Sequence, residues 1–249
     1  MKLDFTDQVV LITGATRGIG KQIADDFYNL GANLILTGTN PEQIKKLNEA
    51  TDQQKKNITY HCVDFLDSES TTKFTDALDR YDRIDVCINN AGINRINLIE
   101  QTIIKDWNDI IAVNLTAPFM IIKKVSKIMK KNGYGRIINI SSIWGHISKE
   151  KRSPYSSSKF GLRGLTVAAS IELARYNILV NTVSPGFVLT DLTQKILSKK
   201  EMKDLCFQIP AGRLANPDDI SPVVLFLSSS LNKYIAGQNI IVDGGFVNV

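Results

Sequence analysis

Short apolar runs alternate with amphipathic segments along almost the whole chain, and this alternation constrains the fold more than any other feature. Parallel strands that are buried on both faces lose the alternation of polar and apolar residues, and they need helical crossovers between them. The intervening segments supply such helices, so the pattern predicts an α/β domain with a parallel sheet. The expected strands are residues 9–13, 34–37, 58–63, 86–89, 136–141, 179–184 and 240–242.

The expected helix ends agree with this reading. A helix over residues 19–30 is closed by Gly31, and a helix over residues 41–50 is opened by Asn40 as a cap before Pro41. The result is a repeated βαβ pattern, which predicts a doubly wound, Rossmann-type sheet. In such sheets ligands bind beyond the carboxyl ends of the strands, so the site is expected in the loops after Thr13, Asn89, Ser141 and Ser184.

Length and composition favour one domain over residues 1–249, because no linker or low-complexity tract interrupts the chain. The three cysteines lack Cys-x-x-Cys spacing, which argues against a disulfide framework and a zinc site. With two histidines in the whole chain, metal-free chemistry is favoured over a His-based metal centre or a Ser-His-Asp triad. The chain begins directly with an expected strand and has no apolar leader, so a cytoplasmic protein without a membrane span is expected.

The net charge of +5 is modest, although five lysines fall along one predicted helix. Aromatic residues are not interleaved with them, so a solvated helix face is favoured over a nucleic-acid surface, and no nucleic-acid partner is expected. These lysines are residues 123, 124, 127, 130 and 131.

A glycine-rich segment joins the first expected strand to the first helix. Gly14, Gly18 and Gly20 would let the backbone turn tightly and bring N–H groups and a helix N-terminus against a pyrophosphate, with Thr16, Arg17 and Ile19 between them. A purely structural turn is the alternative. The position between a strand and a helix favours a dinucleotide site.

The end of the second strand bears on the choice of cofactor. Where an NAD enzyme carries an acidic residue for the ribose 2′-hydroxyl, this chain reads Thr37-Gly38-Thr39-Asn40. Arg17 offers a cation and Thr39 and Asn40 offer uncharged donors, a combination that suits the 2′-phosphate of NADP(H). NADP(H) is therefore favoured over NAD(H), with Arg17 as a surface cap of the helix as the alternative.

Tyr155 and Lys159 are four residues apart, so on a helix they share one face. A phenol is a poor acid–base catalyst at neutral pH unless a neighbouring cation lowers its pKa. Ser142 precedes Tyr155 by thirteen positions and ends the fifth expected strand. Each feature alone has an ordinary structural explanation, but together they predict carbonyl–alcohol chemistry.

In combination these motifs resemble the short-chain dehydrogenase/reductase family over nearly the whole chain, and among its members they look most like bacterial 3-oxoacyl-ACP reductases. The matching segments are Thr13 to Gly20, Asn89-Asn90-Ala91-Gly92, Val113-Asn114-Leu115, Ser142, Tyr155 with Lys159, and Pro185-Gly186. The resemblance implies an NADP(H)-dependent oxidoreductase that reduces a carbonyl to a hydroxyl on a small or carrier-linked substrate. A sugar or polyol dehydrogenase is the alternative, and a cofactor-binding regulator without catalysis is a third reading.

The resemblance also implies a role for each matching residue. Tyr155 would be the general acid, Ser142 would bind the substrate oxygen, Lys159 would lower the pKa of Tyr155 and hold the nicotinamide ribose, and Asn114 would hold a water in a proton relay. Asp64 and Phe65 would lie by adenine, and Asn90, Ala91 and Gly92 would support the cofactor's ribose. The nicotinamide would be contacted by the segment that contains Pro185, Gly186, Val188 and Thr190, and Val188 and Thr190 would meet its carboxamide.

Two segments bear on the substrate. The residues before Tyr155 include Lys149, Lys151 and Arg152 where the fatty-acid enzymes usually have an uncharged run, so these cations either meet an anionic substrate or are exposed, and exposure is favoured. Residues 189–209 combine apolar and charged positions and are expected to form a lid over the site. The expected apolar helices 115–129 and 154–174, with the resemblance, predict a homotetramer.

Overall fold

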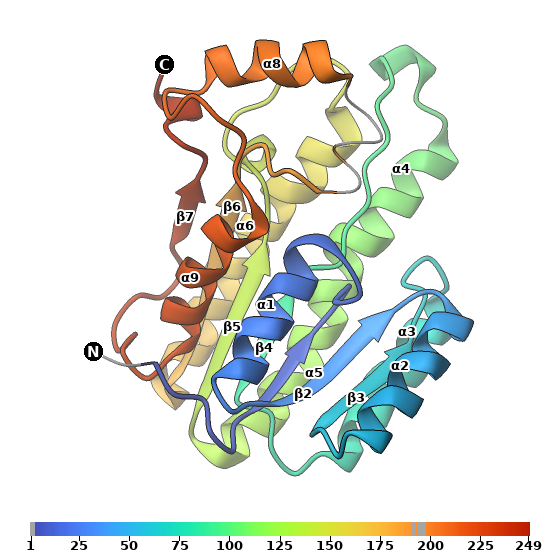
Figure 1. Ribbon diagram of the computed structural model, residues 1–249, viewed down its shortest axis with the longest axis vertical. Helices are drawn as coiled ribbons and strands as arrows, with labels where there is room; N and C mark the ends of the chain where they lie inside the picture. The colour runs from blue at the N-terminus through green and yellow to red at the C-terminus, as the bar shows by residue number, and fades with distance from the viewer. Residues whose placement is uncertain (1–2, 191–192, 194–197) are drawn as a thin grey trace.

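The computed structural model describes residues 3–190, 193 and 198–249 (Figure 1). The described residues form a seven-stranded sheet in the order β3-β2-β1-β4-β5-β6-β7, and every neighbouring pair is parallel. All the expected strands are present, with each end within one residue of its predicted place. The strands are β1 Val9–Ile12, β2 Asn33–Gly38, β3 Ile58–Cys62, β4 Val86–Asn89, β5 Gly135–Ile140, β6 Ile178–Pro185 and β7 Asn239–Val242.

Helices cover both faces of the sheet, so the predicted doubly wound fold is confirmed. One apolar core lies under α1 and α9, and a second core on the opposite face lies under α3, α5 and α6. The helices are α1 Gly18–Asn29, α2 Pro41–Gln53, α3 Ser68–Ala77, α4 Ile104–Ile111, α5 Ala117–Asn132, α6 Ser153–Leu173, α8 Lys199–Gln208 and α9 Pro217–Ser228.

Local chemistry accounts for the helix ends. Asn40 caps α2 as expected, since its side-chain oxygen accepts a hydrogen bond from the Gln43 N–H at 2.9 Å. Gly133 ends α5 in the left-handed conformation with φ 63°, which glycine adopts without strain. A π-helical turn, Ala112–Thr116, joins α4 to α5 and holds Asn114. Within the described part of the chain, no helix has the length and apolar character needed to cross a bilayer.

The chain reverses its direction of travel across the sheet between β1 and β4. It first runs from β1 outward to β3 and then returns to β4 on the other side of β1. The loops that follow β1 and β4 therefore run in opposite directions, and they leave a crevice beyond the carboxyl ends of these two strands. Figure 1 shows α8 lying beyond the same ends of the sheet.

The segment expected to form a lid is described in part. Its helix α8 begins with a capping box in which the Ser198 hydroxyl accepts from the Glu201 N–H and the Glu201 carboxylate accepts from the Ser198 N–H. Residues 191–192 and 194–197 of this segment lie outside the described residues.

Candidate active site

Close backbone approach explains the glycines of the loop after β1. Gly14 and Gly18 have φ values of 64° and 56°, in the left-handed region. A Cβ on Gly20 would lie 2.4 Å from both Asn90 Nδ2 and the Gly14 carbonyl oxygen, a separation that atoms cannot adopt. This loop therefore depends on glycine, and α1 begins directly behind it with no acidic side chain in its first turn.

Asn90 holds the loop after β4 against this glycine loop. Its Nδ2 donates to the carbonyl oxygens of Thr13 at 2.9 Å and Gly14 at 3.0 Å. In return, the N–H groups of Asn90 and Ala91 each donate to Thr13 Oγ1 at 3.0 Å. The segment predicted to support the cofactor is thus part of the same hydrogen-bonded unit as the glycine loop.

The expected 2′-phosphate residues lie at the exposed surface beside this unit. Arg17 is exposed at the N-cap of α1, where its side chain makes no capping hydrogen bond. Thr39 and Asn40 are exposed after β2, although the Asn40 oxygen serves as the cap of α2, which leaves its Nδ2 as donor. Thr16 packs under this corner, since a Cβ on Gly38 would lie 2.5 Å from Thr16 Cγ2. Ile19 packs against the core below α1.

The two residues predicted to meet adenine differ in their surroundings. Asp64 is exposed after β3, and its Oδ1 accepts from the Leu66 N–H at 3.0 Å. The Phe65 ring is buried in the core against Phe74, with ring centroids 6.3 Å apart. Through its side chain Phe65 is a core residue, because an apolar ring is more stable away from water, so only its main chain can face a ligand.

Three residues of the predicted catalytic set converge where β5 and α6 meet. Ser142 follows β5, and its hydroxyl accepts from the Trp144 N–H at 3.2 Å. Tyr155 and Lys159 lie on one face of α6, with Lys159 Nζ 5.7 Å from the centre of the Tyr155 ring. The Lys159 ammonium is buried and donates to the Ile140 carbonyl oxygen at 2.9 Å.

Burial and neighbouring groups shift the pKa values of Tyr155 and Lys159. Burial raises the pKa of the Tyr155 phenol above its ordinary value, while a hydrogen bond with Ser142 and the charge of Arg152 lower it. Burial also lowers the pKa of Lys159 to about 8. Arg152 is the cation that lowers the pKa of the phenol in this structure, and Lys159 donates to the Ile140 carbonyl oxygen, so a lowering of the Tyr155 pKa by Lys159 stays a prediction.

Asn114 is fully buried, and its side chain is used for positioning. Its Nδ2 donates to the Ile93 carbonyl oxygen at 2.9 Å and to Ser158 Oγ at 3.0 Å, and its Oδ1 accepts from the Ile93 N–H at 2.9 Å. Both amide hydrogens are thus occupied, and the predicted water relay would need another group of this residue. Gly92 lies beside it, because a Cβ there would be 3.4 Å from Asn114 Oδ1 and 3.5 Å from Lys159 Nζ.

The segment that follows β6 lies on the other side of the predicted catalytic residues. Pro185 ends β6, and Gly186 packs so closely on Asp243 that a Cβ would lie 2.8 Å from the Asp243 Cα. Val188 is buried and its carbonyl oxygen accepts from the Thr193 hydroxyl at 2.6 Å. Thr190 reaches back to the glycine loop, 3.5 Å from the place of a Cβ on Gly18.

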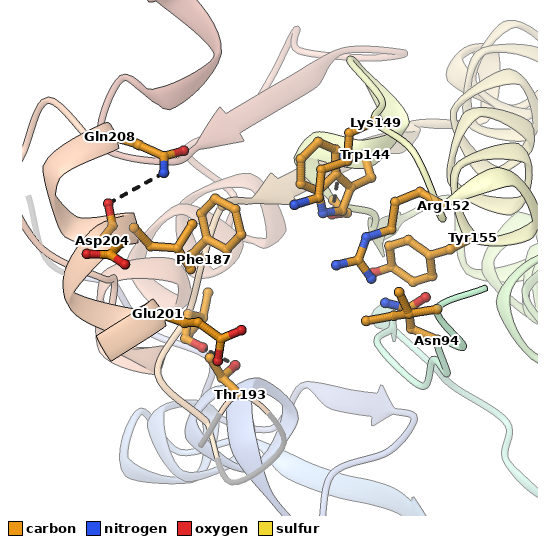
Figure 2. Close-up of a pocket in the computed structure, with 15 residues that line it drawn as sticks. Asn94, Trp144, Lys149, Arg152, Tyr155, Phe187, Thr193, Glu201, Asp204 and Gln208 are labelled. Carbon is orange, nitrogen blue, oxygen red and sulfur yellow. Dashed lines mark hydrogen bonds between the residues drawn. The ribbon is translucent and has the colours of Figure 1, made fainter. Parts of the chain in front are cut away.

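A cavity of about 380 Å³ opens beside Tyr155 and Ser142 (Figure 2). Trp144 and Phe187 form an aromatic side of it and pack edge to face, with ring centroids 6.1 Å apart. Arg152 and Lys149 lie on the Tyr155 side, and α8 contributes Glu201 and Asp204 across the cavity. This is the substrate-sized space that Ser142 and Tyr155 face.

Comparison with known proteins places this fold and site in a family. The family model described as enoyl-(acyl carrier protein) reductase matches residues 14–247. A 3-oxoacyl-[acyl-carrier-protein] reductase FabG from Aquifex aeolicus (strain VF5) is 40% identical over 248 residues, which cover 98% of this chain and 99% of that protein. The chain belongs to the short-chain dehydrogenase/reductase family.

Solved structures agree with this assignment to the short-chain dehydrogenase/reductases. A gluconate 5-dehydrogenase from Burkholderia cenocepacia J2315, in complex with NADP and tartrate, is 28% identical with a TM-score of 0.91, and the match covers 99% of this chain and 97% of that one. ElxO with NADP bound is 30% identical with a TM-score of 0.89, over 98% of this chain and 100% of that one.

Sequence reasoning gave no role to one part of the cavity wall of this family member, namely Asn94, Ile96, Trp144 and Phe187. Phe187 belongs to no motif, and no pattern in the sequence separates it from an ordinary loop residue, whereas Asp204 falls within residues 189–209, the segment predicted to cover the site. Asn94 follows the matching Asn89 to Gly92 segment by two positions, which was a usable signal. Arg152 was weighed and assigned mainly to the surface, but it is partly buried and lines the cavity, whereas Lys151 is exposed.

Proposed function

We propose that the protein is an NADPH-dependent reductase that converts a carbonyl group to a hydroxyl, as its 3-oxoacyl-[acyl-carrier-protein] reductase relatives are named to do. The observation that carries the proposal is that Ser142 and Tyr155 line one cavity, with Lys159 one helical turn from Tyr155 on α6, at the same strand ends as the glycine loop. The two similar structures that hold NADP support the choice of cofactor.

The residues present fit a dinucleotide. The glycine loop and the acid-free N-terminus of α1 suit a pyrophosphate, and Arg17 and Thr39 suit a 2′-phosphate. Lys159 and Gly92 adjoin one another where the nicotinamide ribose is predicted to bind. NADPH, when bound, supplies the hydride that reaches the carbonyl carbon.

The protein's own groups then handle the carbonyl oxygen. The Ser142 hydroxyl would donate a hydrogen bond to it, and the Tyr155 hydroxyl would deliver the proton as negative charge develops there. Because burial holds the Tyr155 phenol protonated, the ground state in the reducing direction already carries the acid form. Asn114 would keep α6 in register through its bond to Ser158.

A sugar or polyol dehydrogenase is the second candidate. The cavity presents Lys149, Arg152, Glu201 and Asp204, which is more charge than an acyl chain needs. The structural similarity to a gluconate 5-dehydrogenase points the same way. A turnover screen with NADPH over acetoacetyl thioesters, keto-sugars and quinones separates the candidates, and no turnover with any carbonyl compound would refute the proposal.

We further propose that residues 189–209 act as a lid. In the described part of this segment, α8 lines the cavity with Glu201, Asp204, Leu205 and Gln208, opposite Tyr155. Closure would exclude water from the cavity during hydride transfer. Hydrogen exchange with and without NADPH should show added protection across the segment, and its absence would leave the segment an ordinary surface element.

A homotetramer remains our proposal for the assembly. Large apolar side chains are exposed on α4, α5 and α6, and burial between subunits would remove them from water. They include Ile104, Trp107, Phe119, Phe160, Val167 and Ile171. Light scattering that gave a monomer mass at micromolar concentration would count against it.

A further inference from the structure

Two cations lie against the aromatic side of the cavity, next to the catalytic tyrosine. Arg152 Cζ is 5.9 Å and Lys149 Nζ is 5.5 Å from the centre of the Trp144 ring. An aromatic face at this range attracts a cation and restrains its position. Arg152 directly precedes α6, so it lies within one turn of Tyr155, and Figure 2 shows its guanidinium beside the Tyr155 ring.

Two polar side-chain atoms of the residues that line this cavity have no hydrogen-bond partner within the described part of the protein. Arg152 Nε and Asn94 Oδ1 are both buried, and neither has a hydrogen-bond partner among the described residues. Arg152 forms no ion pair with a carboxylate in the part of the chain that the structure describes, so no carboxylate of the protein neutralises it there. A buried donor without a hydrogen-bond partner destabilises the folded protein, and such donors are rare in folded proteins. A bound ligand that accepts the hydrogen bond would remove this cost.

Local charge on this side of the cavity suits an anion. The first turn of α6 has no acidic residue, and its N-cap has no side-chain hydrogen bond. The partial positive charge at the N-terminus of this long helix therefore adds to the charges of Arg152 and Lys149. The guanidinium is planar and binds carboxylates with paired hydrogen bonds. The carboxylates in the cavity, Glu201 and Asp204, lie on the opposite wall and would turn an anionic group toward Arg152.

We propose that the substrate is a short oxo acid, and that Arg152 is the specificity-determining residue that binds its carboxylate while Tyr155 and Ser142 bind its carbonyl. Asn94 Oδ1, Glu201 and Asp204 would accept hydrogen bonds from hydroxyl groups between the two ends. This inference rests on the proposed carbonyl reduction and narrows its substrate class. An uncharged acyl chain would leave Arg152 without a partner.

The test compares 4-oxopentanoate with its methyl ester, two substrates that differ in the charge of one end. In the native protein kcat/KM for the acid should exceed that for the ester, and Arg152→Gln should reduce the acid-to-ester ratio about tenfold or more, the usual worth of a charge-assisted hydrogen bond. The ratio cancels any effect of Arg152 on the pKa of Tyr155, because both substrates share it. Lys151→Gln removes an exposed charge from the same segment and should leave the ratio unchanged.

Binding gives a second readout that does not depend on turnover. Calorimetry of 4-oxopentanoate on Tyr155→Phe with NADPH should show affinity that Arg152→Gln reduces and Arg152→Lys partly restores. If an acetoacetyl thioester is reduced but the acid-to-ester ratio does not respond to Arg152, the inference is overturned and the proposed function stands. If no carbonyl compound is reduced, the proposed function fails and the substrate assignment fails with it, even where the acid binds through Arg152. If Arg152→Gln reduced kcat/KM equally for acid and ester, and Asp204→Asn did the same, Arg152 would act by holding α8 in position. That result would overturn the inference.

Discussion

The two halves of the crevice satisfy their polar groups in different ways. At the cofactor half, Thr13, Thr37 and Asn90 bind neighbouring main-chain groups, for example Thr37 Oγ1 with the Gly14 N–H at 3.1 Å. At the cavity half, Arg152 Nε and Asn94 Oδ1 have no hydrogen-bond partner within the described residues. The polar side chains that hold the cofactor half together are bonded within the protein, whereas the cavity half presents buried side-chain atoms that a ligand can bond.

The difference separates two ways of recognising a ligand. The cofactor half uses the backbone, so it needs glycine at close approaches, and glycine patterns appear in the sequence. The cavity half uses side chains on connecting segments, which carry no fixed motif. A cofactor class can therefore be predicted from such a chain, whereas a substrate class requires the folded structure.

The largest expected effect comes from Tyr155, which lies at the border of the two halves. Tyr155→Phe should reduce turnover by on the order of a hundredfold or more, because the general acid is lost. NADPH affinity should stay nearly native, since the binding loop does not involve this hydroxyl. Steady-state kinetics with calorimetry checks both values, and a variant that turned over its best substrate at near the native rate would contradict the assignment.

Gly20→Ala should damage the cofactor half selectively. The added methyl group would overlap Asn90 Nδ2 and the Gly14 carbonyl oxygen, at a cost of about 1–3 kcal/mol in stability and with weaker NADPH binding. The matched control is Gly164→Ala within α6, where nothing lies within 4 Å of the added atom, and it should be as stable as the native protein or more so. Urea unfolding compares them, and equal stability of the two variants would refute the close approach.

NADPH should bind at least about tenfold more tightly than NADH, a difference of about 1.4 kcal/mol. Arg17 gains a phosphate partner, and no carboxylate ends β2 to repel it. Arg17→Ala should reduce this preference, whereas Arg163→Ala on the exposed side of α6 should not. Calorimetry with both cofactors measures it, and equal affinities in the native protein would remove the roles assigned to Arg17 and Thr39.

Much of this could be predicted from the sequence, for physical reasons. Strands buried on both faces leave continuous apolar runs, so all seven strand positions were predicted, and Asn40 before Pro41 marked the start of α2. The side-chain burial of Phe65 was not predictable, because an aromatic residue after a strand can face either the core or a ligand. Arg152 was misplaced because its partial burial depends on Trp144, which only the fold brings beside it.

The smallest expected effect concerns Lys159, whose burial lowers its pKa to about 8 from about 10.4 in an unfolded chain. Between these values the unfolded chain binds more protons than the folded one, so this residue makes the free energy of unfolding rise with pH. The cofactor-free native protein should therefore gain stability relative to Lys159→Met across that window. A difference between the two proteins that stays flat or falls with rising pH would show that the Lys159 ammonium is not destabilised by burial.

Isotope transfer tests the central claim most directly, namely that both halves of the crevice serve one carbonyl reduction. The native protein would be given NADPH deuterated at both C4 positions, with the best substrate of the turnover screen, in ordinary water. Mass spectrometry should find one deuterium on the carbon that carries the new hydroxyl, while the hydroxyl proton comes through Tyr155 from solvent. A reduced product without deuterium on that carbon, or NADPH that binds but is never consumed with any carbonyl compound, would contradict the account.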